Sequence, residues 1–112
     1  MYVNTLLIII VKKISMNKVG ILAIVEAKSG KERDVSDFLK SALALAQSET
    51  LTLTWYAFQI NHNTFGIFDS FETDEGRDAH LGGPIAAALM ANADALLSKA
   101  PSIQKVDLLA SK

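Results

Sequence analysis

The sequence of 112 residues contains no cysteine. This absence excludes a disulfide framework, cysteine-based zinc sites, iron–sulfur clusters and thiol nucleophiles, and it fits a cytoplasmic protein. An excess of charge is also lacking, because 11 Lys and Arg residues stand against 12 Asp and Glu residues. Without surplus positive charge to bind a phosphate backbone, we expect no nucleic-acid partner.

Long hydrophobic runs are missing from the N-terminal region. The apolar run at residues 6–11 is far shorter than the ~20 residues that cross a bilayer, so we expect no membrane association. A signal peptide is not indicated, because the basic pair Lys12 and Lys13 follows this run and no positive residue precedes it. Met16 offers a second start directly before a strand pattern. We therefore interpret residues 1–15 as an N-terminal extension or an upstream start-site artefact, and residues 16–112 as a single domain.

Hydrophobic periodicity in the first half of this domain predicts one helix between strands. Residues 20–27 are almost continuously apolar, which is typical of a strand covered on both faces. Ser29 and Glu32 match a capping box, and the apolar spacing after them predicts a helix over residues 31–47. Residues 51–60 and 65–71 flank a polar turn and carry Thr, aromatic and aliphatic residues, which predicts a β-hairpin.

The second half predicts two more helices and a strand. Thr73 and the acidic residues after it begin a short helix, which the glycine pair at residues 82–83 ends. A proline at each end bounds a second helix over residues 84–99, and residues 103–110 form the last strand. This order, β-α-β-β-α-β, is the ferredoxin-like arrangement of an α+β protein, with helices on one face of a mostly antiparallel sheet.

The predicted sheet has apolar residues on both faces. In the strand at residues 51–60, Trp55 belongs to one face, whereas Tyr56 and Phe58 belong to the other. Since a helix layer covers one face only, the second face leaves more apolar surface than a soluble monomer usually exposes. We therefore expect a homodimer that forms through the sheet face, with C2 symmetry.

Three short motifs resemble the antibiotic biosynthesis monooxygenase (ABM) domain family. They are Glu49 a few residues before the aromatic strand, Asp69 in the next strand, and the helix that ends in His80 and Leu81. The resemblance covers about residues 18–112. It implies a homodimeric α+β barrel in which each protomer's pocket lies between its sheet and its helices.

The resemblance also narrows the expected activity. Members of this family include cofactor-free oxygenases acting on quinols and anthrones, haem-degrading enzymes and a quorum-signal isomerase. Haem-degrading members combine an asparagine in the first strand, a tryptophan in the third and a histidine in the helix, and here only His80 matches. The resemblance therefore implies a cofactor-independent monooxygenase that oxidises a quinol- or anthrone-like aromatic with molecular oxygen. A non-catalytic small-molecule-binding dimer and an isomerase of a small hydroxyketone are the alternatives.

Cofactor-free oxygenation requires an apolar pocket, a base and a hydrogen-bond donor, because the deprotonated substrate itself supplies the electron to oxygen. His80 is the natural base or donor, since the ordinary pKa of histidine is nearest to neutrality. Its alternative role is structural, as a cap of the short helix or a core residue. Asp69 lies on the strand side shared with Phe65 and Ile67, where a buried carboxylate has to be paired or neutralised. His80 and Asp69 are thus the candidate catalytic residues.

The candidate substrate-binding residues are more numerous. Arg77 is a partner for Asp69 or for an anionic substrate oxygen, although an arginine in a short surface helix is more often solvated. The resemblance favours Trp55 as a pocket wall, with a plain core role as the alternative. Asn92 either orients a ligand or bonds a neighbouring backbone group. The remaining candidates are apolar residues expected to line the pocket on packing grounds: Phe38, Phe65, Ile67, Leu89 and Met90.

The sequence contains no complete motif for a nucleotide-binding or metal-binding site. The glycine pair at residues 82–83 follows a helix, and Gly30 lacks the earlier glycine of a phosphate loop, so neither indicates a nucleotide site. His62 lies in the hairpin turn with no second ligand at metal-binding spacing. We therefore expect neither a metal nor a cofactor.

Overall fold

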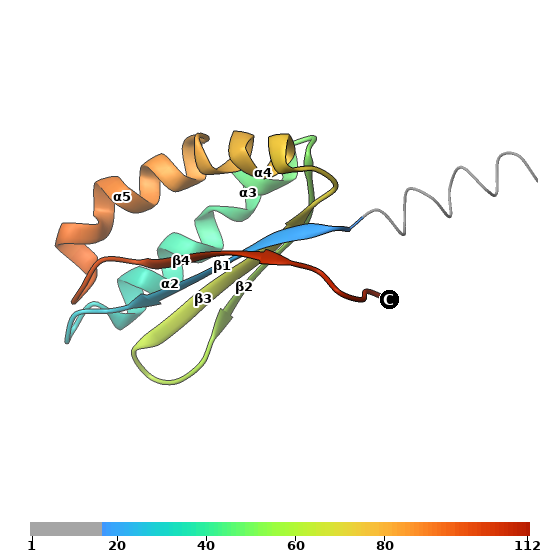
Figure 1. Cartoon of the computed structure of the whole chain (residues 1–112). Coiled ribbons are helices and arrows are strands. Elements are labelled where there is room, and N and C mark those ends of the chain that lie inside the picture. The colour runs from blue at the N-terminus through green and yellow to red at the C-terminus, as the bar shows by residue number, and fades with distance from the viewer. Residues whose placement is uncertain (1–16) are drawn as a thin grey trace, which may run out of the picture.

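The computed structural model describes residues 17–112, which form four strands and four helices (Figure 1). The predicted extension at residues 1–15 lies outside the described residues. The strands are β1 (Val19–Glu26), β2 (Thr52–Gln59), β3 (Thr64–Phe71) and β4 (Ser102–Asp107). The helices are α2 (Glu32–Ser41), α3 (Leu43–Ser48), α4 (Asp74–Leu81) and α5 (Pro84–Leu96).

The strands form one sheet in the order β2-β3-β1-β4, and every neighbouring pair is antiparallel. The four helices lie together on one face of this sheet (Figure 1). The predicted ferredoxin-like α+β arrangement is therefore confirmed. Because β1 and β3 are the two central strands, the side chains that point from them toward the helices are buried.

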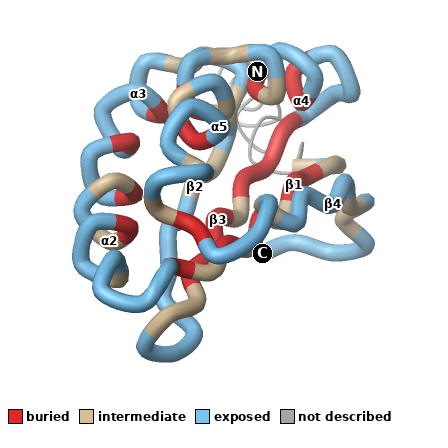
Figure 2. The backbone as a smooth tube through the Cα atoms, turned by 90° about the vertical axis from the view of Figure 1, so that its left-hand side faces the viewer, coloured by how far each residue is buried: buried red, intermediate tan, exposed pale blue. Residues whose placement is uncertain are grey.

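The hydrophobic core lies between the helices and these two central strands. Figure 2 shows that buried residues are concentrated along β1 and β3 and on the helix sides that face them. The apolar core residues that pack together here come from both strands, α2, α5 and the segments that follow β1 and α5: Ala23, Val25, Ala27, Val35, Leu39, Phe65, Ile67, Leu89 and Leu97. The alternation of β1 thus directs every second side chain into the core.

The opposite face of the sheet carries an apolar patch that the helices leave open. Cross-strand pairing aligns Tyr56, Phe68 and Leu22 in one row of this face. In the next row the ring of Phe58 lies over Gly66, a close approach that a side chain at residue 66 would block. Tyr56 is 59 % exposed and Phe58 is 37 % exposed. Within the described chain, β1 is therefore covered by helices on one face only.

The predicted single helix over residues 31–47 is wrong in one respect, because the structure divides it in two. α2 ends at Ser41, whose hydroxyl donates to the carbonyl of Phe38. Ala42 joins the two helices. Its backbone keeps helical φ and ψ angles, and its side chain is buried. The change of direction places Ala46 of α3 in a small cluster with Ala42 and Ile85.

The predicted capping box is also wrong. The N-cap of α2 is Lys31 rather than Ser29, and no side chain caps this helix. The carboxylate of Glu32 instead turns back and accepts the backbone N–H of Gly30 at 2.8 and 3.0 Å. Gly30 has φ +85°, a left-handed conformation that glycine adopts without strain and that reverses the chain before the helix.

The predicted end of the last helix lies three residues too far along the chain. α5 ends at Leu96, and Leu97 is extended and bridges Ala27 beside β1. Leu97 is buried in the core, so its packing competes with the helical continuation that the alanine-rich sequence favours. The beginning of α4 agrees with the sequence prediction, because the hydroxyl of Thr73 accepts the N–H of Gly76.

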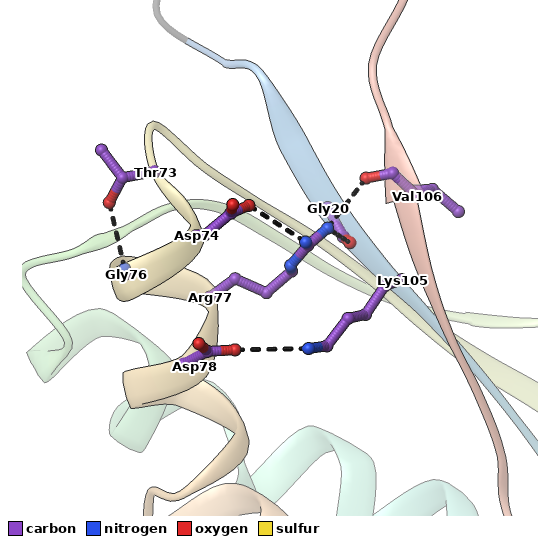
Figure 3. A network of polar contacts seen from close by, with 8 residues as sticks. All are labelled: Gly20, Thr73, Asp74, Gly76, Arg77, Asp78, Lys105 and Val106. Atoms are coloured by element: carbon purple, nitrogen blue, oxygen red, sulfur yellow. Dashed lines mark hydrogen bonds and ion pairs between the residues drawn. The ribbon is translucent and has the colours of Figure 1, made fainter.

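Arg77 connects α4 to the sheet (Figure 3). Its Nη1 donates to the carbonyl oxygens of Gly20 at 3.3 Å and Val106 at 3.1 Å, and these two residues face each other across β1 and β4. Its Nη2 bonds Asp74 at 3.1 Å. The partners of Arg77 thus do not include Asp69, and the alternative of a solvated side chain is wrong, since only 8 % of the residue is exposed. Its guanidinium group holds the helix against the sheet edge.

Replacing Arg77 by Met should destabilise the protein. The substitution removes three hydrogen bonds to a charged donor and leaves two carbonyl groups without it, so we expect a loss of about 2–3 kcal/mol in the free energy of unfolding. Urea denaturation measures this change. Arg33→Met is the matched control, because Arg33 is exposed on α2 and should cost about 0.5 kcal/mol or less. Equal losses in the two variants would contradict the role assigned to Arg77.

Candidate functional site

Three ionisable side chains from distant parts of the chain meet beneath α4. His80 Nδ1 lies 2.6 Å from Glu49 Oε1, and His80 Nε2 lies 2.8 Å from Asp69 Oδ2. The side chains of His80 and Asp69 are 7 % and 2 % exposed, and that of Glu49 is 16 % exposed. We call these three residues the carboxylate–histidine clamp, because the imidazole ring is held by a carboxylate at each nitrogen.

Local structure explains how each member reaches the clamp. Glu49 is the extended residue that ends α3, three residues before β2 begins. Asp69 alternates with Ile67 and Phe71 on the helix-facing side of β3, so its side chain points toward the helices. His80 lies in the last turn of α4, one turn after Arg77, on the same buried side of that helix. Its ring also packs against Phe71, with the ring centres 5.4 Å apart.

The electrostatic surroundings favour the protonated form of His80. Burial by itself lowers the pKa of His80, but the hydrogen bond and charge of Asp69, followed by those of Glu49, outweigh burial and raise the pKa above its ordinary value. A protonated imidazole donates from both ring nitrogens, and both nitrogens here face a carboxylate oxygen. In this protonated form the ring makes a charge-assisted hydrogen bond to each of the two carboxylates.

Two surface hollows adjoin the clamp along the outer edge of β2. The first, which we call the Glu49 hollow, has a volume of about 280 Å³ and reaches both Glu49 and His80. The second, the Trp55 hollow, has a volume of about 290 Å³ and shares Glu49 and Thr52 with the first. Each volume approaches the lower end of the range for small-molecule pockets.

The space between the sheet and the helices beside Asp69 and His80 is much smaller. One apolar hollow there measures about 30 Å³ and has Asp69 and His80 in its wall, together with Ile67 and Leu89. A space of this size admits a water-sized group rather than an aromatic ring system. The space between the sheet and the helices at Asp69 and His80 is therefore too small for an anthrone in this structure, and the larger hollow that reaches His80 is the Glu49 hollow.

The structure brings together some of the predicted site residues. His80 and Asp69, the candidate catalytic pair, are in direct contact. Trp55 faces the helices and lines the Trp55 hollow, whereas Tyr56 belongs to the opposite face. The indole N–H of Trp55 is buried without a hydrogen-bond partner among the described residues.

Other predicted substrate-binding residues lie away from the clamp. Phe65 lines a separate hollow of about 220 Å³ between α2 and β2, and Phe38 and Asn92 line an apolar space of about 10 Å³. Asn92 donates to the carbonyl of Ala88, which is the backbone role given as its alternative. Met90 is 58 % exposed, so its assignment to a pocket lining is wrong. Arg77 lines neither hollow beside the clamp.

Glu49 belongs to the clamp but was not among the site residues predicted from the sequence. The ABM-like motif includes a glutamate before the aromatic strand, and this was the available signal. Spacing alone does not place Glu49 beside a histidine 31 residues later. The fold does so, because α3 ends and α4 passes at the same edge of the sheet.

The described residues contain neither a metal-binding group nor a membrane-spanning helix. Across residues 17–112, no group of three or more His, Cys, Asp or Glu side chains is arranged to hold a metal ion. His62 lies exposed in the turn between β2 and β3, as predicted. None of the helices in this part of the chain has the length and apolar character needed to span a membrane.

Comparison with known proteins gives a consistent picture of the fold. No protein-family profile matches the sequence, and no curated protein matches it either. Among solved structures, a protein of unknown function from Nitrosomonas europaea is 52 % identical, with a TM-score of 0.86, and the match covers 88 % of this chain and 95 % of that one.

More distant structures carry a family name. A protein from Deinococcus radiodurans named as a candidate antibiotic biosynthesis monooxygenase is 12 % identical, with a TM-score of 0.74 over 84 % of this chain and 95 % of that one. A second protein with this name, from Nitrosomonas europaea, is 10 % identical, with a TM-score of 0.74 over 82 % of this chain and 99 % of that one. At these identities the likeness shows the fold.

The clamp should make stability depend on pH. Because the pKa of His80 is raised in the folded state, its stabilising contribution is complete below the unfolded pKa and is lost as pH rises through the folded pKa. We therefore expect the free energy of unfolding to fall as pH increases from about 6.5 to above the raised pKa. Urea denaturation across this range measures the change, and His80→Gln should remove it. His62→Gln, on the exposed turn, is the control that should retain it.

Proposed function

Since this chain belongs to one family with the Nitrosomonas europaea protein of unknown function, and to the antibiotic biosynthesis monooxygenase fold family, we propose that it is a cofactor-independent monooxygenase. Its substrate is a quinol- or anthrone-like aromatic, and its oxidant is molecular oxygen. The observation that supports this proposal is the imidazole ring of His80, which is held between the carboxylates of Glu49 and Asp69 in the wall of the Glu49 hollow.

The reaction needs an aromatic that becomes electron-rich when it loses a proton. In an anthrone, loss of one C–H proton leaves an anion that passes an electron to O₂, and the resulting radical and superoxide combine to form a C–O bond. The peroxide takes up a proton, a second C–H bond breaks, and the O–O bond breaks with release of water. One oxygen atom thus enters the product as a ketone, the other enters water, and the substrate supplies all the electrons.

His80 assists this reaction through its charge. Negative charge develops first on the deprotonated aromatic and then on superoxide, and a fixed positive charge beside the ligand stabilises both. The imidazolium lines the Glu49 hollow and is largely shielded from solvent, so water screens its charge only weakly. Asp69 acts as a positioning residue, because it fixes the orientation of the ring and favours the charged form.

The proposal includes a homodimer, which forms through the sheet face that the helices leave open. Tyr56, Phe58 and Phe68 form an apolar patch with Leu22 and Ile24, and the helices cover only the other side of the sheet. Contiguous apolar surface of this kind usually marks an interface with another protein. A second copy that pairs face to face would bury the same patch on both chains, as C2 symmetry requires.

Oxygen uptake by purified, metal-stripped protein tests the activity. With hydroquinones and anthrones as substrates, and with spontaneous oxidation subtracted, we expect saturable uptake that His80→Gln lowers about 100-fold or more. His62→Gln is the matched control, because His62 is exposed in the hairpin turn and should leave uptake unchanged.

One outcome would contradict the role of His80, and two others would contradict the oxygenase itself. Uptake that survives in His80→Gln would remove His80 from the mechanism. Turnover that proceeds equally under argon would indicate the isomerase of a small hydroxyketone. Binding of the aromatics without any turnover would indicate the non-catalytic small-molecule-binding dimer.

A charge on the open sheet face should weaken the dimer. Tyr56→Lys places an ammonium group in the apolar patch while leaving the core untouched, since Tyr56 is 59 % exposed. We expect the dimer dissociation constant to rise about 10-fold or more, as measured by sedimentation velocity over a range of concentrations. Leu109→Lys, at a residue that is 98 % exposed after β4, should leave the constant unchanged. A monomeric unsubstituted protein would refute the dimer itself.

A further inference from the structure

The two carboxylate oxygens of Glu49 have different surroundings. Oε1 accepts hydrogen bonds from Thr52 Oγ1 at 2.8 Å and from His80 Nδ1 at 2.6 Å. Oε2 has no hydrogen-bond partner among residues 17–112, and Glu49 lines both hollows along the edge of β2. Oε1 therefore holds the ring of His80. Oε2 keeps its lone pairs free to accept a proton from a ligand.

Gly83 leaves room for a ligand in front of this oxygen. A Cβ atom on Gly83 would lie 3.5 Å from Glu49 Oε2 and 3.2 Å from the carbonyl oxygen of His80. Gly83 is also part of the lining of the Glu49 hollow, at the start of α5. The bare backbone at this point keeps the approach to Oε2 clear on the side of α5.

The other members of the clamp are poorly placed to receive a proton. Both ring nitrogens of His80 face carboxylates, and its charged form is already favoured. Asp69 is 1 % exposed, and its second oxygen is buried without access to either surface hollow. Apart from Glu49 and His80, the residues that line the two hollows carry no ionisable side chain.

We propose that Glu49 is the proton acceptor of this site, and that Oε2 takes the acidic hydrogen of an aromatic bound in the Glu49 hollow. This assignment rests on the proposed function and adds the residue that begins its reaction. The ligand is an aromatic with an acidic C–H or O–H group. Its C–H or O–H bond breaks, the proton bonds to Oε2, and the electron pair remains on the aromatic as an anion beside the imidazolium. No oxidant takes part in this step.

Hydrogen exchange under argon isolates the step. An anthrone in deuterated buffer exchanges its acidic C–H hydrogens when an enzyme removes and returns them, and proton NMR follows the loss of signal. We expect the unsubstituted protein to accelerate exchange, and Glu49→Gln to lower the accelerated rate about 100-fold or more, because the amide still accepts hydrogen bonds but is no longer a base. Glu75→Gln is the matched control, since Glu75 is an exposed carboxylate on α4.

The exchange and oxygen-uptake measurements separate the two assignments. Exchange that depends on Glu49 without oxygen uptake in air would overturn the oxygenase and uphold Glu49 as the acceptor. Exchange that persists in Glu49→Gln would overturn Glu49 as the acceptor, and oxygen uptake that persists in this variant would do the same while leaving the oxygenase standing. Neither exchange nor uptake by the unsubstituted protein would overturn both.

A second variant covers the case in which Glu49→Gln does not fold. Glu49→Ala removes the carboxylate and opens space at the clamp, so added formate should restore exchange if the missing group is a base. A purely structural carboxylate predicts no such rescue. Rescue that increases with formate concentration upholds the assignment, and its absence in a folded Glu49→Ala protein overturns it.

Discussion

The structure depends on a buried histidine ring that a carboxylate holds at each of its two nitrogens. Glu49, Asp69 and His80 come from the end of α3, the middle of β3 and the last turn of α4, and their contacts join these segments at one edge of the sheet. A buried charge is tolerated only when partners compensate it, so the removal of one member leaves the others uncompensated. The same interaction therefore supports the fold and supplies the only buried ionic cluster beside a hollow in the described residues.

The clamp is asymmetric, and this asymmetry gives its members different chemistry. Asp69 lies inside the sheet–helix core, where its contact with His80 is sheltered from solvent. Glu49 lies at the outer edge of β2, where one oxygen still faces open space. When the open carboxylate takes up a proton, the cluster of a protonated ring and two carboxylates changes from a net charge of -1 to neutral, which removes its repulsion of an anion in the open hollow. Arg77, one turn earlier on α4, keeps the helix that carries His80 at a fixed height above the sheet.

The sequence predicted the strands, the helix layer and the order of elements, because hydrophobic alternation and turn residues act locally. It also placed Asp69 on the core side of its strand and required a partner for it, and the partner proved to be His80. It did not predict the break at Ala42 or the turn of Glu32 toward Gly30, since these depend on packing and on competing local hydrogen bonds. The pairing of Glu49 with His80 and the burial of Arg77 are contacts across the fold, which no periodicity encodes.

The fold alone leaves the reaction open, since one fold hosts many activities. The clamp restricts the choice more than the fold does. Oxygenation of an anthrone and isomerisation of a hydroxyketone begin in the same way, with the removal of an acidic hydrogen and the stabilisation of an anion. An open carboxylate beside a fixed imidazolium suits this first step in both reactions. What distinguishes the two reactions is the fate of the anion, which oxygen oxidises in one case and a returning proton quenches in the other. The proposed role of the clamp therefore concerns the class of ligand, an acid that becomes an electron-rich anion, before it concerns the product.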